Sequence, residues 1–105
     1  MLVLTTDTIL NGEVERVLGF VEGSSVRTVH LGRHVRGFFR RMIGGELTYY
    51  SQLTKKARIE ARERMVKEAE KLGADAVIGV RYTTAVVAAG AAEIIAYGTA
   101  VKLKD

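Results

Sequence analysis

The apolar pattern of the chain changes its period within one short segment, Leu72–Tyr82. Upstream of it, apolar residues recur every three or four positions from Tyr50 onward, a spacing typical of one helical face. Downstream, apolar residues recur at every second position, a spacing typical of a strand. Gly73 stands at the change, where a glycine in the left-handed conformation closes a helix without steric cost. The sequence therefore predicts a helix over 49–72, capped by Thr48, and then a strand.

The carboxy-terminal third predicts a β-hairpin. Alternation runs from Ala76 to Val87, the Ala-Ala-Gly-Ala run at 88–91 can turn the chain, and Ala92–Leu103 returns as a second strand. One face of this hairpin is small, and it includes Gly79 and Gly98. Because the helix stripe is also rich in alanine, we expect this small face to lie beneath the helix.

The amino-terminal half predicts three further elements. Leu2–Thr6 has the composition of a short strand, and Asn11-Gly12 is a strong turn signal. Val14–Val26 alternates imperfectly and predicts a strand with a bend at Gly19 or Gly23. Apolar spacing over His30–Met42 predicts a second, weaker helix. The predicted fold class is therefore α+β in two layers, with the order β-β-α-α-β-β and a mostly antiparallel sheet under one long helix.

Length and composition set limits on the protein's class. A chain of 105 residues fits a single domain spanning residues 1–105. It contains no cysteine, which excludes disulfides, thiolate metal sites and cysteine nucleophiles. The amino terminus lacks the pattern of a signal peptide, and no apolar run is long enough to cross a membrane. We therefore expect a cytoplasmic protein with no membrane partner.

Several blocks resemble one known family. They are Thr5-Thr6, Gly12, the strand containing Gly19 and Gly23, Ile43-Gly44-Gly45, Tyr50-x-x-Leu53-x-x-x-Ala57-Arg58, Leu72-Gly73-Ala74-Asp75-Ala76-Val77-Ile78-Gly79-Val80 and Gly98-Thr99-Ala100-Val101. Together they resemble the YbjQ family of small prokaryotic proteins, described as heavy-metal-binding but functionally uncharacterised. The matching blocks extend over nearly the whole chain and follow one another in the same order as in the family.

The resemblance implies a compact α+β subunit, similar in architecture to dodecin-like subunits and assembled into a homopentameric ring. It implies no established reaction. The chain departs from the family at His30 and His34, where members tend to carry Asn and Asp, so residue roles in that segment do not transfer directly.

The two histidines form a candidate metal site. His30 and His34 are four residues apart, so on a helix both imidazoles face the same side and can share a divalent ion such as zinc, nickel or copper. Glu22, Glu46 or a residue of another copy would have to complete the ligand set. The alternative is a pair of solvent-facing histidines at the start of a helix.

A run of arginines forms a second candidate site, for anions. Five arginines and no acidic residue lie between Val26 and Gly45. Repeated around a ring, they would form a positive band able to hold phosphates, nucleic acid or an anionic cofactor. The alternative is a solvated face, or arginines paired with acids of a neighbouring subunit. The candidate anion-binding residues are Arg33, Arg36, Arg40 and Arg41.

No catalytic constellation can be assembled from the sequence, so we do not expect an enzyme. The glycines follow neither dinucleotide-binding nor phosphate-loop spacing. Asp75 stands just after a helix end, where a carboxylate typically bonds nearby backbone amides.

The apolar content predicts self-association. Tyr49, Tyr50, Ile59, Val66, Ile94 and Ile95 exceed what one helical stripe and one sheet face can bury, and exposed apolar surface of this kind usually marks an interface. Unpaired sheet edges also favour pairing with a neighbour's strand. We therefore expect the chain's main partner to be further copies of itself.

Overall fold

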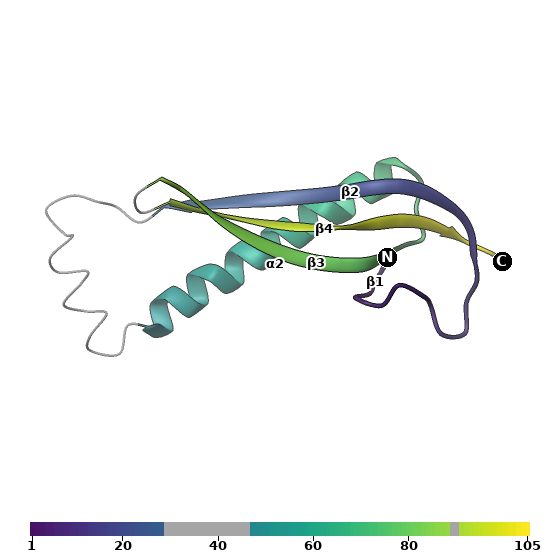
Figure 1. Ribbon diagram of the computed structural model, residues 1–105, viewed down its shortest axis with the longest axis horizontal. Helices are drawn as coiled ribbons and strands as arrows, with labels where there is room; N and C mark the ends of the chain where they lie inside the picture. Colours follow the sequence, from purple (N-terminus) through teal and green to yellow (C-terminus); the bar gives the residue numbers. More distant parts are fainter. Residues whose placement is uncertain (29–46, 89–90) are drawn as a thin grey trace, which may run out of the picture.

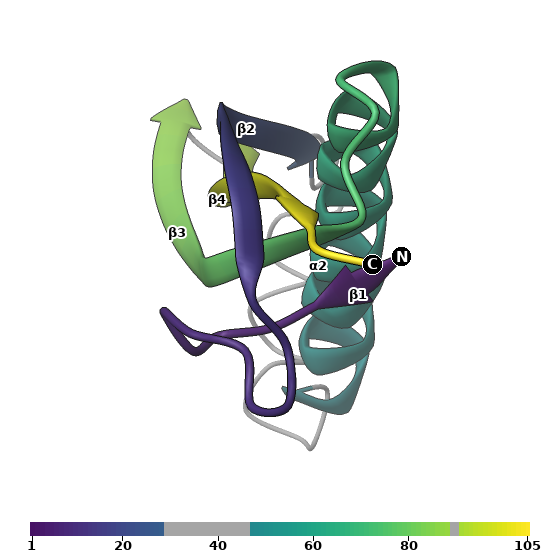
Figure 2. The same ribbon diagram turned by 90° about the vertical axis from the view of Figure 1, so that its right-hand side faces the viewer.

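The computed structural model describes residues 1–28, 47–88 and 91–105. They form strands β1 (Leu2–Val3), β2 (Val14–Thr28), β3 (Ala76–Ala88) and β4 (Ala91–Leu103), and one long helix, α2 (Leu47–Lys71). The strands make one sheet and α2 lies across one face of it, which gives two layers (Figure 1, Figure 2). The predicted α+β class is therefore confirmed. The helix predicted over His30–Met42 lies outside the described residues, so the order observed is β-β-α-β-β.

The sheet has the strand order β1-β3-β4-β2. β4 pairs antiparallel with both β2 and β3, and the predicted hairpin is present, with Ala88 and Ala91 as partners. β1 is shorter than predicted and pairs parallel with β3, although the amide of Leu4 still donates to the carbonyl of Val77 at 2.9 Å. The sheet is therefore mixed, and mostly antiparallel as expected.

The carboxyl end of α2 closes at Gly73 as predicted. Gly73 has a φ of 77°, and its amide donates to the carbonyl of Glu70 at 3.0 Å. The amide of Ala74 donates to the carbonyl of Ala69 at 3.1 Å. These two bonds are the pair that defines a Schellman motif, which satisfies carbonyls left open by the last helical turn.

The other details predicted for the ends of this helix were wrong. α2 begins at Leu47, so Thr48 lies inside the helix and cannot be its cap. Leu72, predicted to belong to the buried stripe, is exposed because it follows the last helical residue. Apolar periodicity locates the middle of a helix better than its ends.

The two layers meet through small residues. Ala57, Ala61 and Ala69 of α2 are completely buried together with Met65. Directly beneath them is Gly23 of β2, where an added Cβ would lie 2.2 Å from the amide nitrogen of Met65. The alanine-rich stripe was therefore predicted correctly, but the glycine that allows the closest approach is Gly23.

The small face of the predicted hairpin is confirmed for β4 only. Ala96, Gly98 and Ala100 are buried on the side of the sheet that α2 covers. In β3, Gly79 has a φ of 62° and coincides with a shift in the pairing register. The predicted strict alternation of β3 is therefore wrong: Val80 joins the core beneath α2, as Val77 does, because the irregularity at Gly79 changes which side chains face the helix.

The amino-terminal connection covers one end of the sheet's opposite face. The predicted turn is present: Asn11 has a φ of 67°, and the amide of Gly12 donates to the carbonyl of Ile9 at 3.3 Å. Ile9 packs against a small second core on the side of the sheet away from α2. Gly19, a predicted bend, has a φ of 134° and lies at a register shift between β2 and β4.

Candidate functional site

The two candidate sites predicted from the sequence fall in a segment that is not described. His30, His34, Arg33, Arg36, Arg40 and Arg41 all lie within residues 29–46. Of the two acids considered as further metal ligands, Glu46 lies there too, and Glu22 is exposed on β2. Within residues 1–28, 47–88 and 91–105, no three His, Asp or Glu side chains are grouped so as to hold a metal ion. No helix in this part of the chain is long and apolar enough to cross a membrane.

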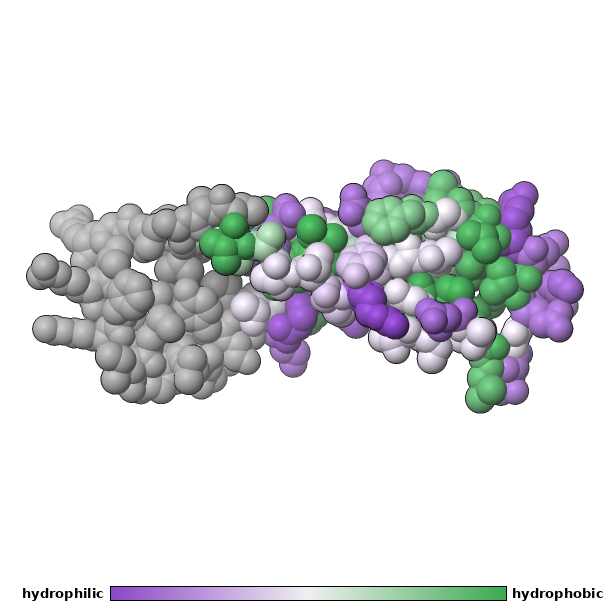
Figure 3. Space-filling model, viewed as in Figure 1, coloured by the Kyte–Doolittle hydropathy of each residue, from purple (hydrophilic) through white to green (hydrophobic). Residues whose placement is uncertain are grey.

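The outer face of the sheet, defined as the face opposite α2, carries exposed apolar side chains. Phe20 is 66% exposed and Val26 is 51% exposed on β2. Beside them on β4, Tyr97 and Ile95 are half-buried, and the rings of Phe20 and Tyr97 lie 6.2 Å apart. In Figure 3, pale residues predominate over the centre of this face, with hydrophilic ones among them, and hydrophobic residues gather toward the right; the helix lies behind this face. The described residues thus leave most of one sheet face uncovered.

A groove of about 1050 Å³ lies beside β2. Arg64, Lys67, Glu68 and Lys71 of α2 line it on the helix side, and Glu22 and Glu93 line it on the sheet side. Three basic and three acidic side chains thus line the groove, which as a whole favours neither an anionic nor a cationic ligand.

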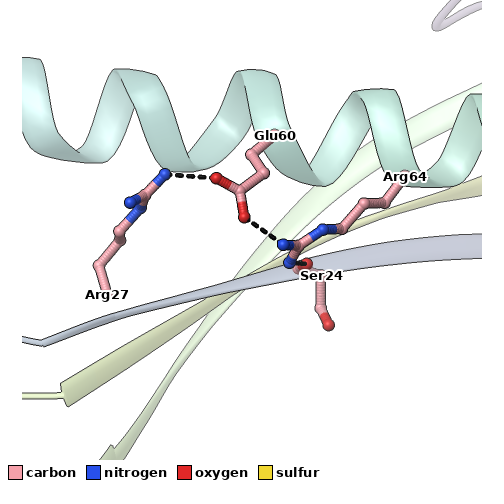
Figure 4. Close-up of polar contacts among 4 residues, drawn as sticks. All are labelled: Ser24, Arg27, Glu60 and Arg64. Atoms are coloured by element: carbon pink, nitrogen blue, oxygen red, sulfur yellow. Dashed lines mark hydrogen bonds and ion pairs between the residues drawn. The ribbon is translucent and has the colours of Figure 1, made fainter.

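A charged network joins β2 to α2 (Figure 4), and two of its residues, Ser24 and Arg64, also line this groove. Glu60 accepts from the guanidinium groups of both Arg27 and Arg64, and Arg64 also donates to the carbonyl of Ser24. One carboxylate thus links two cations from different layers. The network holds the last part of β2 against the helix.

Among the described residues, two buried polar atoms in or beside this network have no hydrogen-bond partner. They are Oγ of Ser25, whose side chain is buried, and Nε of Arg27. A buried hydroxyl without a partner lowers stability by its unrecovered desolvation energy. Ser25 is therefore a weak point of the layer interface.

Asp75 ties the end of the sheet together. Its Oδ2 accepts from the backbone amide of Leu103 at 2.9 Å, and its Oδ1 lies 3.6 Å from Nζ of Lys102. The backbone bond from Leu103, with a smaller contribution from Lys102, lowers the pKa of Asp75 from its ordinary value. Asp75 does bond a backbone amide, but the expectation of a nearby amide was wrong, because the donor belongs to Leu103 of β4, distant in sequence. Asp75 is thus placed as a structural clamp.

Comparison with known proteins decides the family. A family model with the description "Putative heavy-metal-binding", that of the YbjQ family, matches residues 1–104. The chain belongs to the YbjQ family. A UPF0145 protein of Methanosarcina acetivorans is 52% identical over 105 residues, covering 100% of this chain and 99% of the relative. A UPF0145 protein of Thermotoga maritima is 50% identical over 104 residues, covering 99% and 98% of the two chains.

A solved structure supports the fold of this YbjQ family member. It is a protein of unknown function of the DUF74 family from Pediococcus pentosaceus, with a TM-score of 0.62 and 19% sequence identity. The match covers 99% of this chain and 98% of that chain. At this identity the similarity concerns the fold alone. The resemblance inferred from the sequence motifs is therefore confirmed, and the activity of the family member is a separate question.

Sequence patterns did not reveal two features of this region. The bare outer face was not located, because Phe20 and Val26 look like ordinary strand residues until the position of α2 is known. The pair of Glu60 with Arg64 spans only four residues of the helix, a spacing that the sequence does show. The contacts with Arg27 and Ser24 of β2 join residues more than thirty positions apart, so no local spacing could indicate them. Six apolar residues were predicted to be more than one helical stripe and one sheet face can bury. Of these, Ile94 is buried in the core and Ile59 is partly exposed.

Proposed function

We propose that this YbjQ family member is a single-domain, dodecin-like subunit of a cytoplasmic, ring-forming homo-oligomer that binds a metal ion or another small ligand. The observation that carries the proposal is the bare outer face of the sheet. A two-layer α+β domain buries one face of its sheet beneath its helix, and apolar side chains exposed on the second face favour a further covering surface. Further copies of the chain would provide that surface.

Part of the outer face has the composition of an interface, although Glu22 beside Tyr97 and Glu93 beside Val26 lie on the same face. Phe20 and Tyr97 supply aromatic area, and Val17 and Val26 extend the apolar surface along β2. Aromatic residues are enriched where proteins meet, and large exposed apolar patches on soluble proteins usually mark a docking surface. The number of copies, five, rests on the family resemblance alone.

The mass of the particle tests self-assembly. Light scattering coupled to size exclusion should report a multiple of the 11.5 kDa chain. Phe20→Lys should lower that mass, because it would bury a charge in the interface. Leu10→Lys, at a turn residue that is 89% exposed, serves as a matched control and should leave the mass unchanged. A wild-type particle of the mass of one chain would refute the proposal.

Metal binding is tested separately at the two histidines. Calorimetric titration with zinc or nickel should show binding to the wild-type protein that is weakened by His30→Ala and by His34→Ala, because each imidazole would supply one ligand nitrogen. Gln52→Ala, which removes no metal-ligand type, is the control. Equal heats for the wild type and both histidine variants would contradict a site at His30 and His34.

The arginine run favours a second ligand class, an anion or nucleic acid. Arg33, Arg36, Arg40 and Arg41 carry the proposal, since no acid stands among them in the sequence. Binding of a labelled oligonucleotide should weaken steeply as salt rises, because released counterions drive such association. Absence of binding at low salt would exclude this alternative.

A further inference from the structure

The positive charge of the chain is concentrated in one part of its sequence. Residues 27–62 contain nine basic and two acidic residues, whereas the rest of the chain contains seven basic and ten acidic residues. The net charge of +4 therefore comes from a strongly basic segment in an otherwise acidic chain. In the part of this segment that the structure describes, four of the five basic residues lie on α2.

Three of these four residues form a row along one flank of the helix, which we call the basic row. They are Lys55, Arg58 and Arg62, and all three are exposed. Residues three and four positions apart in a helix leave it on the same side, so the three cations stand one after another along α2. Lys56 is exposed as well and adds a fourth charge on the neighbouring side of the same turns.

The acid nearest to the basic row is directed elsewhere. Glu60 is the only acidic residue of α2 within residues 47–62, and at 3.6 residues per turn it leaves the helix on the side opposite the row. There its two carboxylate oxygens contact Arg27 and Arg64 (Figure 4). Among the described residues, no acid forms an ion pair with a member of the basic row.

The basic row does not serve the stability of the helix. Farther along α2, charges are paired across one turn, as in the contact of Lys71 with Glu68 at 3.0 Å. In the row, Lys55 neighbours Arg58 and Arg58 neighbours Arg62, and like charges at these spacings destabilise a helix by a few tenths of a kcal/mol, about as much as opposite charges stabilise it. A polyanionic partner lying along the row would neutralise these charges.

The dimensions of the row fit a phosphate backbone. At about 1.5 Å of rise per residue, Lys55 and Arg62 are about 10 Å apart along the helix axis. One strand of a DNA duplex carries a phosphate about every 3.4 Å along its own axis, so the row extends over about three phosphates. Arginine also presents a planar fork of N–H donors that binds two phosphate oxygens at once.

Two observations limit the partner and the extent of the site. A helix that binds a lipid surface inserts its apolar face, whereas the apolar face of α2, with Ala57, Ala61 and Met65, is buried against the sheet. At Arg62 the surface becomes mixed, because a shallow groove of about 610 Å³ there is also lined by Glu63 and Glu70. The positive surface is thus confined to the first part of the helix.

We propose that the basic row of α2 binds the phosphate backbone of a nucleic-acid duplex, without selecting its sequence. This inference rests on the second ligand class proposed above and adds a contact surface on the helix, separate from the arginine run. No aromatic side chain stands in the row to stack on a base, so phosphate contacts alone would hold the duplex.

The salt dependence of binding to a short labelled DNA duplex tests the proposal. Each phosphate contact contributes about 0.9 to the slope of log K against log salt concentration, so Arg58→Gln/Arg62→Gln should lower the slope by about 2. Lys67→Gln/Lys71→Gln removes the same charge from the other flank of the same helix and should leave the slope unchanged. All four substituted residues are exposed, so circular dichroism should show both variants folded.

The outcomes separate this inference from the proposal on which it rests. An unchanged slope for Arg58→Gln/Arg62→Gln, or an equal fall in both double variants, would overturn the basic row as the site. If the slope fell only in Arg36→Gln/Arg40→Gln, the arginine run would keep its proposed role and the helix would have none. No binding by the wild type at low salt would refute both.

A membrane surface is excluded by a parallel measurement. Phosphatidylcholine vesicles that contain phosphatidylserine should retain less of the wild-type protein than the DNA duplex does at the same salt concentration. Tighter binding to the vesicles, lost in Arg58→Gln/Arg62→Gln, would assign the basic row to lipid headgroups and overturn the proposal.

Discussion

Gly23 shows how one absent side chain sets the distance between the two layers. An added Cβ would lie 2.2 Å from the amide nitrogen of Met65 and 2.3 Å from the carbonyl oxygen of Ala61. Both atoms belong to the helix backbone and cannot rotate away as a side chain could. The helix can therefore lie this close to β2 only where β2 has glycine.

Gly23→Ala should destabilise the fold more than a typical core substitution. Overpacking costs about 1–3 kcal/mol, and contact with rigid backbone places this case at or above the upper end. Urea unfolding measures the loss. Ser25→Ala, two residues along on the same face, is the matched control: it removes the unpartnered hydroxyl and should leave stability unchanged or raise it by about 1 kcal/mol. Equal stability for Gly23→Ala and the wild type would show that the helix moves freely away from β2.

Asp75 makes the stability of the fold depend on acid pH. Its pKa is lowered in the folded protein by the amide of Leu103 and by Lys102. The ionised carboxylate therefore stabilises the folded state, and this stabilisation is fully present above the unfolded-state pKa. It is lost as the pH falls through the lowered folded-state pKa. Asp75→Asn should therefore be less stable than the wild type at pH 7, and the difference should shrink below about pH 4. Denaturant unfolding of the wild type and Asp75→Asn between pH 7 and about pH 4 measures this difference in stability. A difference that grows on acidification would contradict the stabilising role of the Asp75 carboxylate.

At the scale of elements, α2 and β2 are held together by both apolar packing and charge. The alanine stripe and Met65 form the buried part of the contact, and Glu60 bridges Arg27 and Arg64 at its margin. All three charged side chains are partly exposed, so solvent screening keeps each pair weak. The network orients the end of β2 more than it stabilises the fold.

Glu60→Gln should lower stability by about 1 kcal/mol, since two partly exposed ion pairs are lost at once. The loss should shrink in high salt. Glu68→Gln, which removes the exposed pair with Lys71, is the matched control and should cost less than about 0.5 kcal/mol. Thermal unfolding of the two variants side by side makes the comparison, and an equal effect for both would show that the network adds nothing beyond a surface pair.

At the scale of the whole molecule, the described subunit is elongated, with principal extents of 57 × 22 × 16 Å. It covers only one face of its sheet with its helix (Figure 2). Such a shape leaves a high ratio of surface to core, and small domains are only marginally stable even when compact. Assembly would supply the contacts that the single chain lacks.

The unfolding temperature should therefore rise with protein concentration. Association stabilises the folded state by mass action, so dilution from about 100 μM to about 1 μM should lower the midpoint of a fully reversible transition. Differential scanning fluorimetry across this range provides the measurement, and Phe20→Lys should show a weaker dependence. A wild-type midpoint that stays constant across the range would contradict self-association.

The sequence alone determined the local structure with good accuracy. The change from a helical to an alternating period located the boundary between α2 and β3, and Gly73 closes the helix because only glycine adopts its φ of 77° without strain. The hairpin at 88–91 and the turn at Asn11 were likewise readable, because each depends on neighbours in sequence. The residue blocks also gave the family. The candidate metal and anion sites at His30 and Arg33 stay predictions from sequence.

Only the tertiary structure decided how these elements meet. It showed that Gly23, and not Gly79, lies beneath the helix, because close approach depends on where α2 crosses the sheet. It placed a register shift at Gly79, paired Asp75 with β4, and left Phe20 and Val86 exposed. Periodicity reports which residues share a face of one element, whereas contacts between distant segments depend on their crossing angle and register, which local spacing does not encode.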